Sequence, residues 1–270
     1  MKSKGIAIPY VVWMAIFVVA PLILVVVYAL TNRSGSFTTA NFSSMFQYAP
    51  VFGRSFLLAF IATVICILLG YPMAYFLARE RGRLRNMATM LIMLPMWMNF
   101  LLRTYSWVFL LERNGFFNTL LETIGLPKLD IIDTQGAVVL GMVYNFLPFM
   151  VLPIFSVIEK LDHRLIEAAQ DLGANSTQVF RRVIFPLSLP GVLSGVTMVF
   201  IPSVSTFVIS RLLGGSKSLL LGDLIEMQFL GSAYNPYLGS AISLVMMIIV
   251  LVCMGVMNRF GEGEGEAVVL

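Results

Sequence analysis

The sequence carries little charge. Of its 270 residues, 12% are Asp, Glu, Lys or Arg, whereas 59% are hydrophobic. Soluble domains average about 25% charged and about 45–50% apolar residues, so this composition cannot cover a water-facing surface. It excludes a soluble enzyme and a disordered chain, and it indicates a membrane protein.

Cysteine and histidine are almost missing. Cys66 and Cys253 both lie in apolar runs, so they are interpreted as small buried hydrophobes rather than a disulfide, and a secreted disulfide scaffold is excluded. His163 is the one histidine, and residues 214–218, the nearest approach to a phosphate-binding G-x-x-x-x-G-K-[ST], lack the glycine directly before the lysine. The sequence therefore predicts no catalytic residue, no metal site and no cofactor bound by this chain.

Long charge-free runs are abundant instead. A helix needs about 20 apolar residues to cross the hydrocarbon core, and unpaired backbone is not tolerated in lipid. The runs predict an all-α membrane protein with a single transmembrane domain over residues 1–260 and a flexible acidic tail over 261–270. Six transmembrane helices are expected at about 6–30, 55–78, 87–111, 135–158, 187–211 and 238–259, with a long loop at about 159–186.

Positive charge predicts the orientation. With six spans both termini share one side, and that side holds eleven Lys and Arg against seven on the other. The compact cluster at 79–85 carries most weight, because short loops dominate the positive-inside rule. Both termini are expected in the cytoplasm. The basic residues are then a topology signal, and nucleic acid is excluded as a partner.

The loop at 159–186 has a helical pattern. Gly173 is placed to end a first short helix in a left-handed conformation, and Ser176 to cap a second one. The loop is thus predicted to be a helix–turn–helix that either lies along the membrane surface or docks a cytoplasmic partner. The apolar residues that share one face of the first helix are Leu161, Leu165, Ala168, Ala169 and Leu172.

The same loop resembles the EAA loop of bacterial ABC-importer permeases. That motif is EAA, three residues, Gly, nine residues, then Ile-x-Leu-Pro. The matching residues are Glu167, Ala168, Ala169, Gly173, Val183, Phe185 and Pro186, with Val183 in the Ile place and Phe185 in the Leu place. Strings at 70–72, 144–150, 158–162 and 213–215 extend the likeness over nearly the whole chain. Together they resemble PotB-type permease subunits of bacterial spermidine/putrescine ABC importers.

This resemblance implies a type I importer permease in the bacterial cytoplasmic membrane that moves polyamines by alternating access. The implied partners are a second homologous permease, an extracytoplasmic polyamine-binding protein, and two ATPase subunits that hold ATP and Mg. The residues of the EAA loop would couple this chain to the ATPase.

The substrate pathway is less defined by the sequence. A polyamine should meet carboxylates or aromatic faces, yet the predicted spans have no Asp or Glu at their centres. Selectivity would then be set by the binding protein or by acids on the partner permease. Candidate pathway residues, each with ordinary packing or an interfacial aromatic belt as the alternative, are Tyr71, Trp97, Asn99, Tyr105, Tyr144, Asn145 and Phe207.

Two arginines and one pair of glycines have open roles. Arg103 would lie about 25 Å up a straight third helix, where its side chain would extend to the outer interface. Arg211 is at a similar height, and either arginine could instead contact the binding protein or pair with an acid of the outer loop, Asp223 or Glu226. The Gly191-x-x-x-Gly195 spacing permits close helix contact, with the partner permease or within the subunit.

Three rival functions are weighed. A permease of the same architecture could carry molybdate, sulfate or iron, and anion carriage would favour cationic pathway residues. A secondary transporter or channel would need central ionisable residues, and an intramembrane enzyme would need a nucleophile and base or a metal motif. The sequence lacks the features of the last two.

Overall fold

The computed structural model describes residues 8–231 and 233–265, and within them the secondary structure is helical, with one isolated β-bridge between Thr31 and Phe37. The α-helices are α1 Ile8–Met14, α2 Ala20–Ala29, α3 Ala40–Met45, α4 Ala49–Arg79, α5 Arg83–Trp97, α6 Phe100–Leu111, α7 Phe116–Thr123, α8 Gln135–Glu159, α9 His163–Asp171, α10 Ser176–Val179, α11 Phe185–Ser205, α12 Val208–Leu213, α13 Leu221–Phe229 and α14 Pro236–Gly265. π-helical turns at Ala15–Val19 and Phe180–Ile184 join α1 to α2 and α10 to α11.

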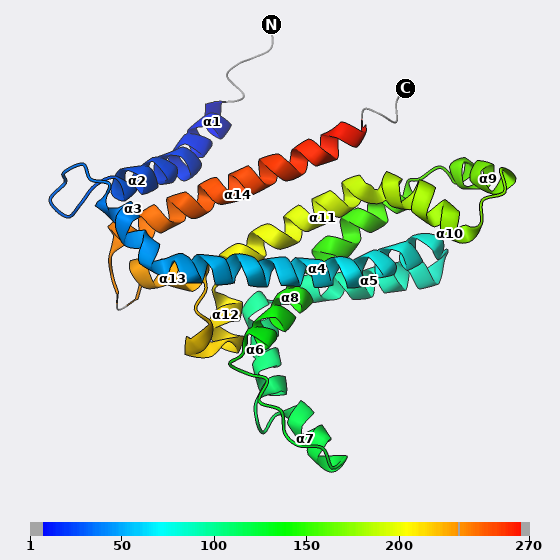
Figure 1. Ribbon diagram of the computed structural model, residues 1–270, viewed down its shortest axis with the longest axis horizontal. Helices are drawn as coiled ribbons and strands as arrows, with labels where there is room; N and C mark the ends of the chain where they lie inside the picture. Colours follow the sequence, from blue (N-terminus) through cyan, green and yellow to red (C-terminus); the bar gives the residue numbers. More distant parts are fainter. Residues whose placement is uncertain (1–7, 232, 266–270) are drawn as a thin grey trace, which may run out of the picture.

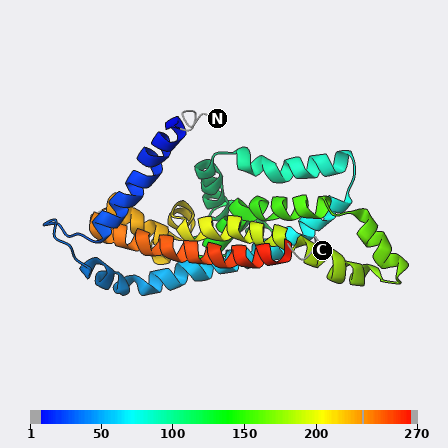
Figure 2. The same ribbon diagram turned by 90° about the horizontal axis from the view of Figure 1, so that it is seen from above.

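Five helical segments of the described chain are long and apolar enough to cross a membrane, and α5 with α6–α7 forms a sixth if the bent pair counts as one span. Helices α4, α8 and α11 pack side by side along the long axis, and α14 lies along α11 (Figures 1 and 2). Helices α9 and α10 stand at one end of this bundle, whereas α3 and α13 lie at the other (Figure 1). Helix α2 packs against α14, whereas α1 extends away from α14 and from the central bundle (Figure 2).

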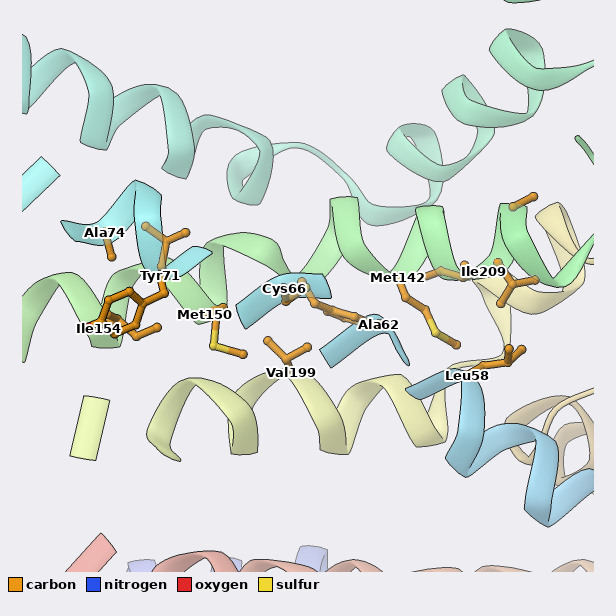
Figure 3. Close-up of a cluster of buried hydrophobic side chains, with 14 of the residues drawn as sticks. Leu58, Ala62, Cys66, Tyr71, Ala74, Met142, Met150, Ile154, Val199 and Ile209 are labelled. Atoms are coloured by element: carbon orange, nitrogen blue, oxygen red, sulfur yellow. The ribbon is translucent and has the colours of Figure 1, made fainter. Parts of the chain in front are cut away.

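Small residues let the central helices approach closely. A Cβ on Gly70 of α4 would lie 2.9 Å from Met150 Cγ, and one on Gly195 of α11 would lie 2.7 Å from Met150 Sδ. Met150 of α8 therefore fills the space between two glycines, beside the buried Cys66 (Figure 3). Gly191 also faces α8, with a Cβ 2.9 Å from the Pro153 carbonyl. The glycine pair of α11 thus packs within the subunit.

The third predicted span is not one straight helix. Helices α5 and α6 meet at a 95° bend, whereas the sequence predicts continuous helix over 87–111. Asn99 causes the break, because its backbone leaves the helical region (φ −58°, ψ 130°) and its Oδ1 accepts hydrogen bonds from the N–H groups of Leu101 (2.9 Å) and Leu102 (3.3 Å). Asn99 therefore starts a new helix, and Pro95, one turn earlier, cannot donate a backbone hydrogen bond.

The last predicted elements also differ from the structure. Thr206 is extended (ψ 141°), so the fifth span ends at Ser205, and α12 begins after a break. Residues 261–265, predicted as part of a flexible tail, continue helix α14. Residues 266–270 of that tail lie outside the described residues.

Candidate functional site

The loop between α8 and α11 is capped at both ends of its first helix. Asp162 accepts a hydrogen bond from the Arg164 N–H (2.9 Å) at the start of α9. At the other end Gly173 has φ +83°, and its N–H donates to the Gln170 carbonyl (2.8 Å), while the Ala174 N–H donates to the Ala169 carbonyl (3.0 Å). This pair of bonds is a Schellman motif. The left-handed conformation predicted for Gly173 is confirmed.

The second short helix begins one residue earlier than the sequence predicts. Asn175, not Ser176, is the N-cap: its Oδ1 accepts from the Gln178 N–H (2.9 Å), and Gln178 Oε1 accepts from the Asn175 N–H (2.8 Å). This reciprocal arrangement is a capping box, which needs Glu or Gln three residues after the cap. Val179 stands at that spacing from Ser176, so only Asn175 can form the box.

Helix α9 has an inner and an outer face. Leu161, Ile166 and Ala169 pack against the hydrophobic core that joins the helix bundle to the loop. On the outside, Leu172 is 90% exposed, and Glu167 is exposed without a hydrogen-bond or ion-pair partner in the described chain. The helix thus presents a leucine and a free carboxylate away from the bundle. Leu165 is also 48% exposed, so the outer side of this segment offers both apolar surface and a free charge to a partner.

An aromatic cluster joins this loop to the membrane helices; we call Tyr71, Tyr75, Phe180 and Phe185 the aromatic joint. The Tyr71 ring lies 5.9 Å from Phe180 and 5.7 Å from Phe185, and the Tyr75 ring lies 5.3 Å from Phe180. Ser188 Oγ donates to the Phe185 carbonyl (2.8 Å), so at 2.8 Å the Tyr71 hydroxyl donates to Ser188. The second half of the EAA pattern is therefore fastened to α4.

Of the two interpretations that the sequence leaves open for Tyr71, the structure favours ordinary packing. It was expected along the substrate pathway, but its side chain is 8% exposed and lies in the core with Ile154 and Ala74 (Figure 3). The sequence offers no signal for this position, because a tyrosine on an apolar helix suits a pathway as well as a core. Its role is to hold the base of the loop.

Replacing Tyr71 with phenylalanine tests the aromatic joint. The change removes one buried hydrogen bond and keeps the ring, so Tyr71→Phe is expected to lower the free energy of unfolding by about 1 kcal/mol. Tyr75→Phe is the matched control, because Arg79 Nη1 donates to Tyr75 at a solvent-exposed position (3.0 Å) and exposed substitutions change stability by less than about 0.5 kcal/mol. Thermal unfolding of the purified chain in detergent measures both. Equal stability of Tyr71→Phe and the unchanged chain would contradict the assignment.

The other predicted pathway residues fall into two groups. Trp97 (70% exposed), Tyr105 (46%) and Phe207 (42%) face outward from this chain, and Asn99 is exposed at the bend between α5 and α6. By contrast, Asn145 is fully buried, and its Nδ2 donates to the Gly141 carbonyl (2.8 Å). Asn145 is therefore a packing residue in this chain, which is the alternative that the sequence leaves open for it.

Tyr144 lies on α8, on the side that faces the bend between α5 and α6. Its ring is half-buried and meets Trp107 edge-on at 5.2 Å. Trp107 in turn stacks on Phe117 of α7, with centroids 6.4 Å apart. Tyr144 thus connects α8 to the outer segment α6–α7 and does not project from the bundle.

Arg103 is the residue for which the sequence prediction is most clearly wrong. Its side chain does not extend to the outer interface: it is 6% exposed, and Nη1 donates to the Pro95 carbonyl (2.5 Å) across the bend. The guanidinium also lies 5.9 Å from the centroids of Phe100 and Tyr144. The Pro95 carbonyl also accepts from the Met98 N–H (3.3 Å), so Arg103 adds a second, charged donor at the bend. It ties α6 to α5, and its contact with the Tyr144 ring reaches α8.

The two acids of the outer loop, Asp223 and Glu226, both form contacts within the chain. Arg211 pairs with Glu226, with Nη1 3.0 Å from Oε1, so the outer-loop pairing considered for it is present. Asp223 is buried and caps its own helix, since Oδ2 accepts from the Leu220 N–H (3.1 Å). Burial raises the pKa of Asp223 above its ordinary value, and the hydrogen bond from the Leu220 N–H opposes this shift. The other carboxylate oxygen, Oδ1, has no hydrogen-bond partner in the described chain.

The fold and the loop define a class of protein. A family model for the inner membrane component of binding-protein-dependent transport systems matches residues 67–261, and the chain belongs to that family. It is a multi-pass inner-membrane permease, as the resemblance of its loop predicts.

The curated relatives are more specific. The chain is 40% identical over 257 residues to the spermidine/putrescine transport system permease protein PotB of Haemophilus influenzae, covering 92% of this chain and 90% of the relative. It is 38% identical over 247 residues to PotB of Escherichia coli strain K12, covering 88% and 90%. The PotB-type resemblance inferred from the sequence is confirmed.

Solved structures show the same architecture. A bacterial ABC transporter that imports the acidic polysaccharide alginate matches with a TM-score of 0.78 at 19% identity, covering 96% of this chain and 94% of the other. The MetNI methionine transporter in an inward-facing conformation matches with a TM-score of 0.63 at 16% identity, covering 82% and 98%. At these identities the likeness establishes the importer-permease fold alone.

Proposed function

We propose that this chain is a permease subunit that carries spermidine or putrescine into the bacterial cytoplasm for an ATP-driven importer. The observation that carries the proposal is its identity of 37–40% to curated PotB permeases over about nine-tenths of its length. The loop supports the same conclusion, because it combines an outward-facing docking surface with a firm attachment to the transmembrane helices.

The coupling mechanism follows from the loop geometry. The exposed face of α9, with Glu167, Ala168 and Leu172, would seat on an ATPase subunit, and the small alanine permits close approach. Closure of the ATPase pair would push α9. The aromatic joint would pass that motion to α4 and to α11, which begins at the EAA residues Phe185 and Pro186. The helices would then rotate as rigid bodies and alternate access to the pathway.

The partner subunits supply what this chain does not. Two ATPase subunits would bind ATP and Mg, a second homologous permease would complete the pathway, and an extracytoplasmic binding protein would deliver the polyamine. This chain would bind no cofactor of its own. With α9 seated on the ATPase, α9 and both termini would lie in the cytoplasm, which is the side that the positive-inside rule predicts for them.

Aromatic surface supports a cationic substrate. Trp97 stands exposed at the end of α5, directly before the bend, and an indole face attracts ammonium groups. The alternative substrates molybdate and sulfate are anions and would favour free arginines along the path. Arg103 is turned into the bundle and Arg211 is paired with Glu226, so neither offers its charge to an anion.

Trp97 substitutions test the substrate face. Trp97→Leu removes a cation–π contact of about 0.5–2 kcal/mol, so the KM for spermidine uptake is expected to rise by about 2- to 30-fold. Trp97→Phe keeps an aromatic face and should raise the KM less. Uptake of radiolabelled spermidine by cells that lack their own polyamine importers measures both. Trp13, exposed on α1, is the matched control, and Trp13→Leu should leave the KM unchanged. Unchanged KM in Trp97→Leu would remove Trp97 from the pathway.

A further inference from the structure

A cavity of about 350 Å³ lies between the loop and the ends of the membrane helices. Its wall is formed by the ends of α4 and α8, by the inner side of α9, and by α10. Cavities of this size hold small ligands or the head of a larger one. The polar and charged side chains on the wall are Arg79, Arg81, Glu159, His163, Gln170 and Ser176.

The charge on this wall is positive. Arg79 is fixed in place, with its guanidinium 5.4 Å from the Tyr75 ring centroid and Nη1 on the Tyr75 hydroxyl. Neither Arg81 nor His163 has an ion-pair or hydrogen-bond partner for its side chain in the described chain. The acid on the wall, Glu159, is neutralised from outside the cavity, since its Oε1 lies 2.7 Å from Arg85 Nη1. Two arginines and a histidine therefore line the cavity without an ion-pair partner in the described chain.

Apolar side chains that are close in sequence to the cavity lining are exposed. Phe76, on the last turns of α4, is 59% exposed, and on the first turns of α5 Leu84 is 57% and Met87 is 62% exposed. Such side chains are stable when they face acyl chains, while the arginines beside them reach the headgroups. Basic pockets between transmembrane helices on the cytoplasmic side are a recognised setting for anionic lipid heads.

We infer that this cavity binds the phosphate of an anionic phospholipid, such as phosphatidylglycerol, from the adjoining leaflet. The remaining N–H groups of Arg79 and the guanidinium of Arg81 would donate to the phosphate oxygens, and His163 would add a donor from α9. The lipid would then connect the helix ends to the coupling loop and brace the loop against the bundle. The identity of the leaflet as cytoplasmic, and the role of the loop in coupling, rest on the proposed function; the binding site does not.

Lipid binding to the purified importer complex, measured by native mass spectrometry with added phosphatidylglycerol or phosphatidylcholine, tests this inference. Phosphatidylglycerol is expected to bind more tightly than phosphatidylcholine. Arg81→Gln should weaken that binding by about fivefold, the effect of one basic residue near an anionic surface, and His163→Gln should weaken it as well. Arg83→Gln is the matched control, because Arg83 belongs to the same basic turn but does not line the cavity.

Two results would overturn the inference. Equal weakening by Arg81→Gln and Arg83→Gln would mean a general attraction between the basic turn and anionic lipid, with no site in the cavity. Displacement of the lipid by inorganic phosphate at about 10 mM would assign the cavity to a soluble phosphate and not to a lipid. The ATPase response to polyamines in the same preparations is a separate readout. Its failure would count against the proposed function while leaving the lipid measurement intact.

Discussion

Glu167→Lys is expected to abolish polyamine uptake without affecting membrane insertion. Glu167 has no partner within the described chain, so its carboxylate is available to the ATPase. Reversing a charge in an interface costs several kcal/mol, and about 3 kcal/mol corresponds to a roughly 150-fold loss of association. Co-purification of the ATPase with the tagged permease, together with uptake, measures the effect.

Two further variants separate coupling from a general effect of charge. Glu167→Gln keeps the shape of the side chain and removes its charge, so an intermediate loss is expected. Glu112→Lys makes the same charge reversal at an exposed residue directly after α6, far from α9 (Figure 1). This variant should leave ATPase association unchanged. Normal uptake by Glu167→Lys would remove the coupling role from this loop.

Arg103→Met is expected to destabilise the permease more than any exposed arginine substitution. It leaves the Pro95 carbonyl at the bend without its charged donor, and hydrogen bonds that involve a charged group contribute about 1.5–3 kcal/mol. Unfolding free energy should fall by about 2–3 kcal/mol, and uptake should fall as well, because the bend sets the positions of Trp97 and Asn99. Arg103→Lys retains one charged donor and is expected to lose about half as much.

The control for this prediction is Arg113→Met. Arg113 is paired with Asp130 at 3.5 Å, but its side chain is 75% exposed, and exposed ion pairs contribute about 0–1 kcal/mol. Thermal unfolding of the purified proteins in detergent compares the three variants directly. An unfolding temperature of Arg103→Met equal to that of Arg113→Met would show that the bend does not depend on the guanidinium.

Features that depend on local sequence were predictable. The apolar runs identify the membrane helices, since their length alone matches a bilayer. The turn of the loop follows from Gly173, because glycine adopts positive φ without steric cost. The N-cap of α10 is also predictable from the sequence, since Gln178 stands three residues after Asn175 and completes the capping box.

Features that depend on contacts between distant segments were not predictable. Arg103 contacts Tyr144 of α8 only because the chain bends at Asn99. The four-residue spacing of Pro95, Asn99 and Arg103 is equally compatible with a straight helix, so it does not predict the bend. Tyr71 and Asn145 were grouped with Trp97 because all are polar or aromatic residues in apolar surroundings. Only packing separates them: Tyr71 and Asn145 are enclosed by neighbouring helices, whereas Trp97 is not.

The central claim is that this chain couples polyamine delivery to ATP hydrolysis by partner subunits. The direct test is the ATPase rate of the co-expressed importer in lipid with its binding protein, with and without spermidine or putrescine. Hydrolysis stimulated by polyamine, and lost in Glu167→Lys, is the predicted result. Hydrolysis that depends on the binding protein but ignores both polyamines would contradict the substrate, and the lack of any ATPase association would contradict the account as a whole.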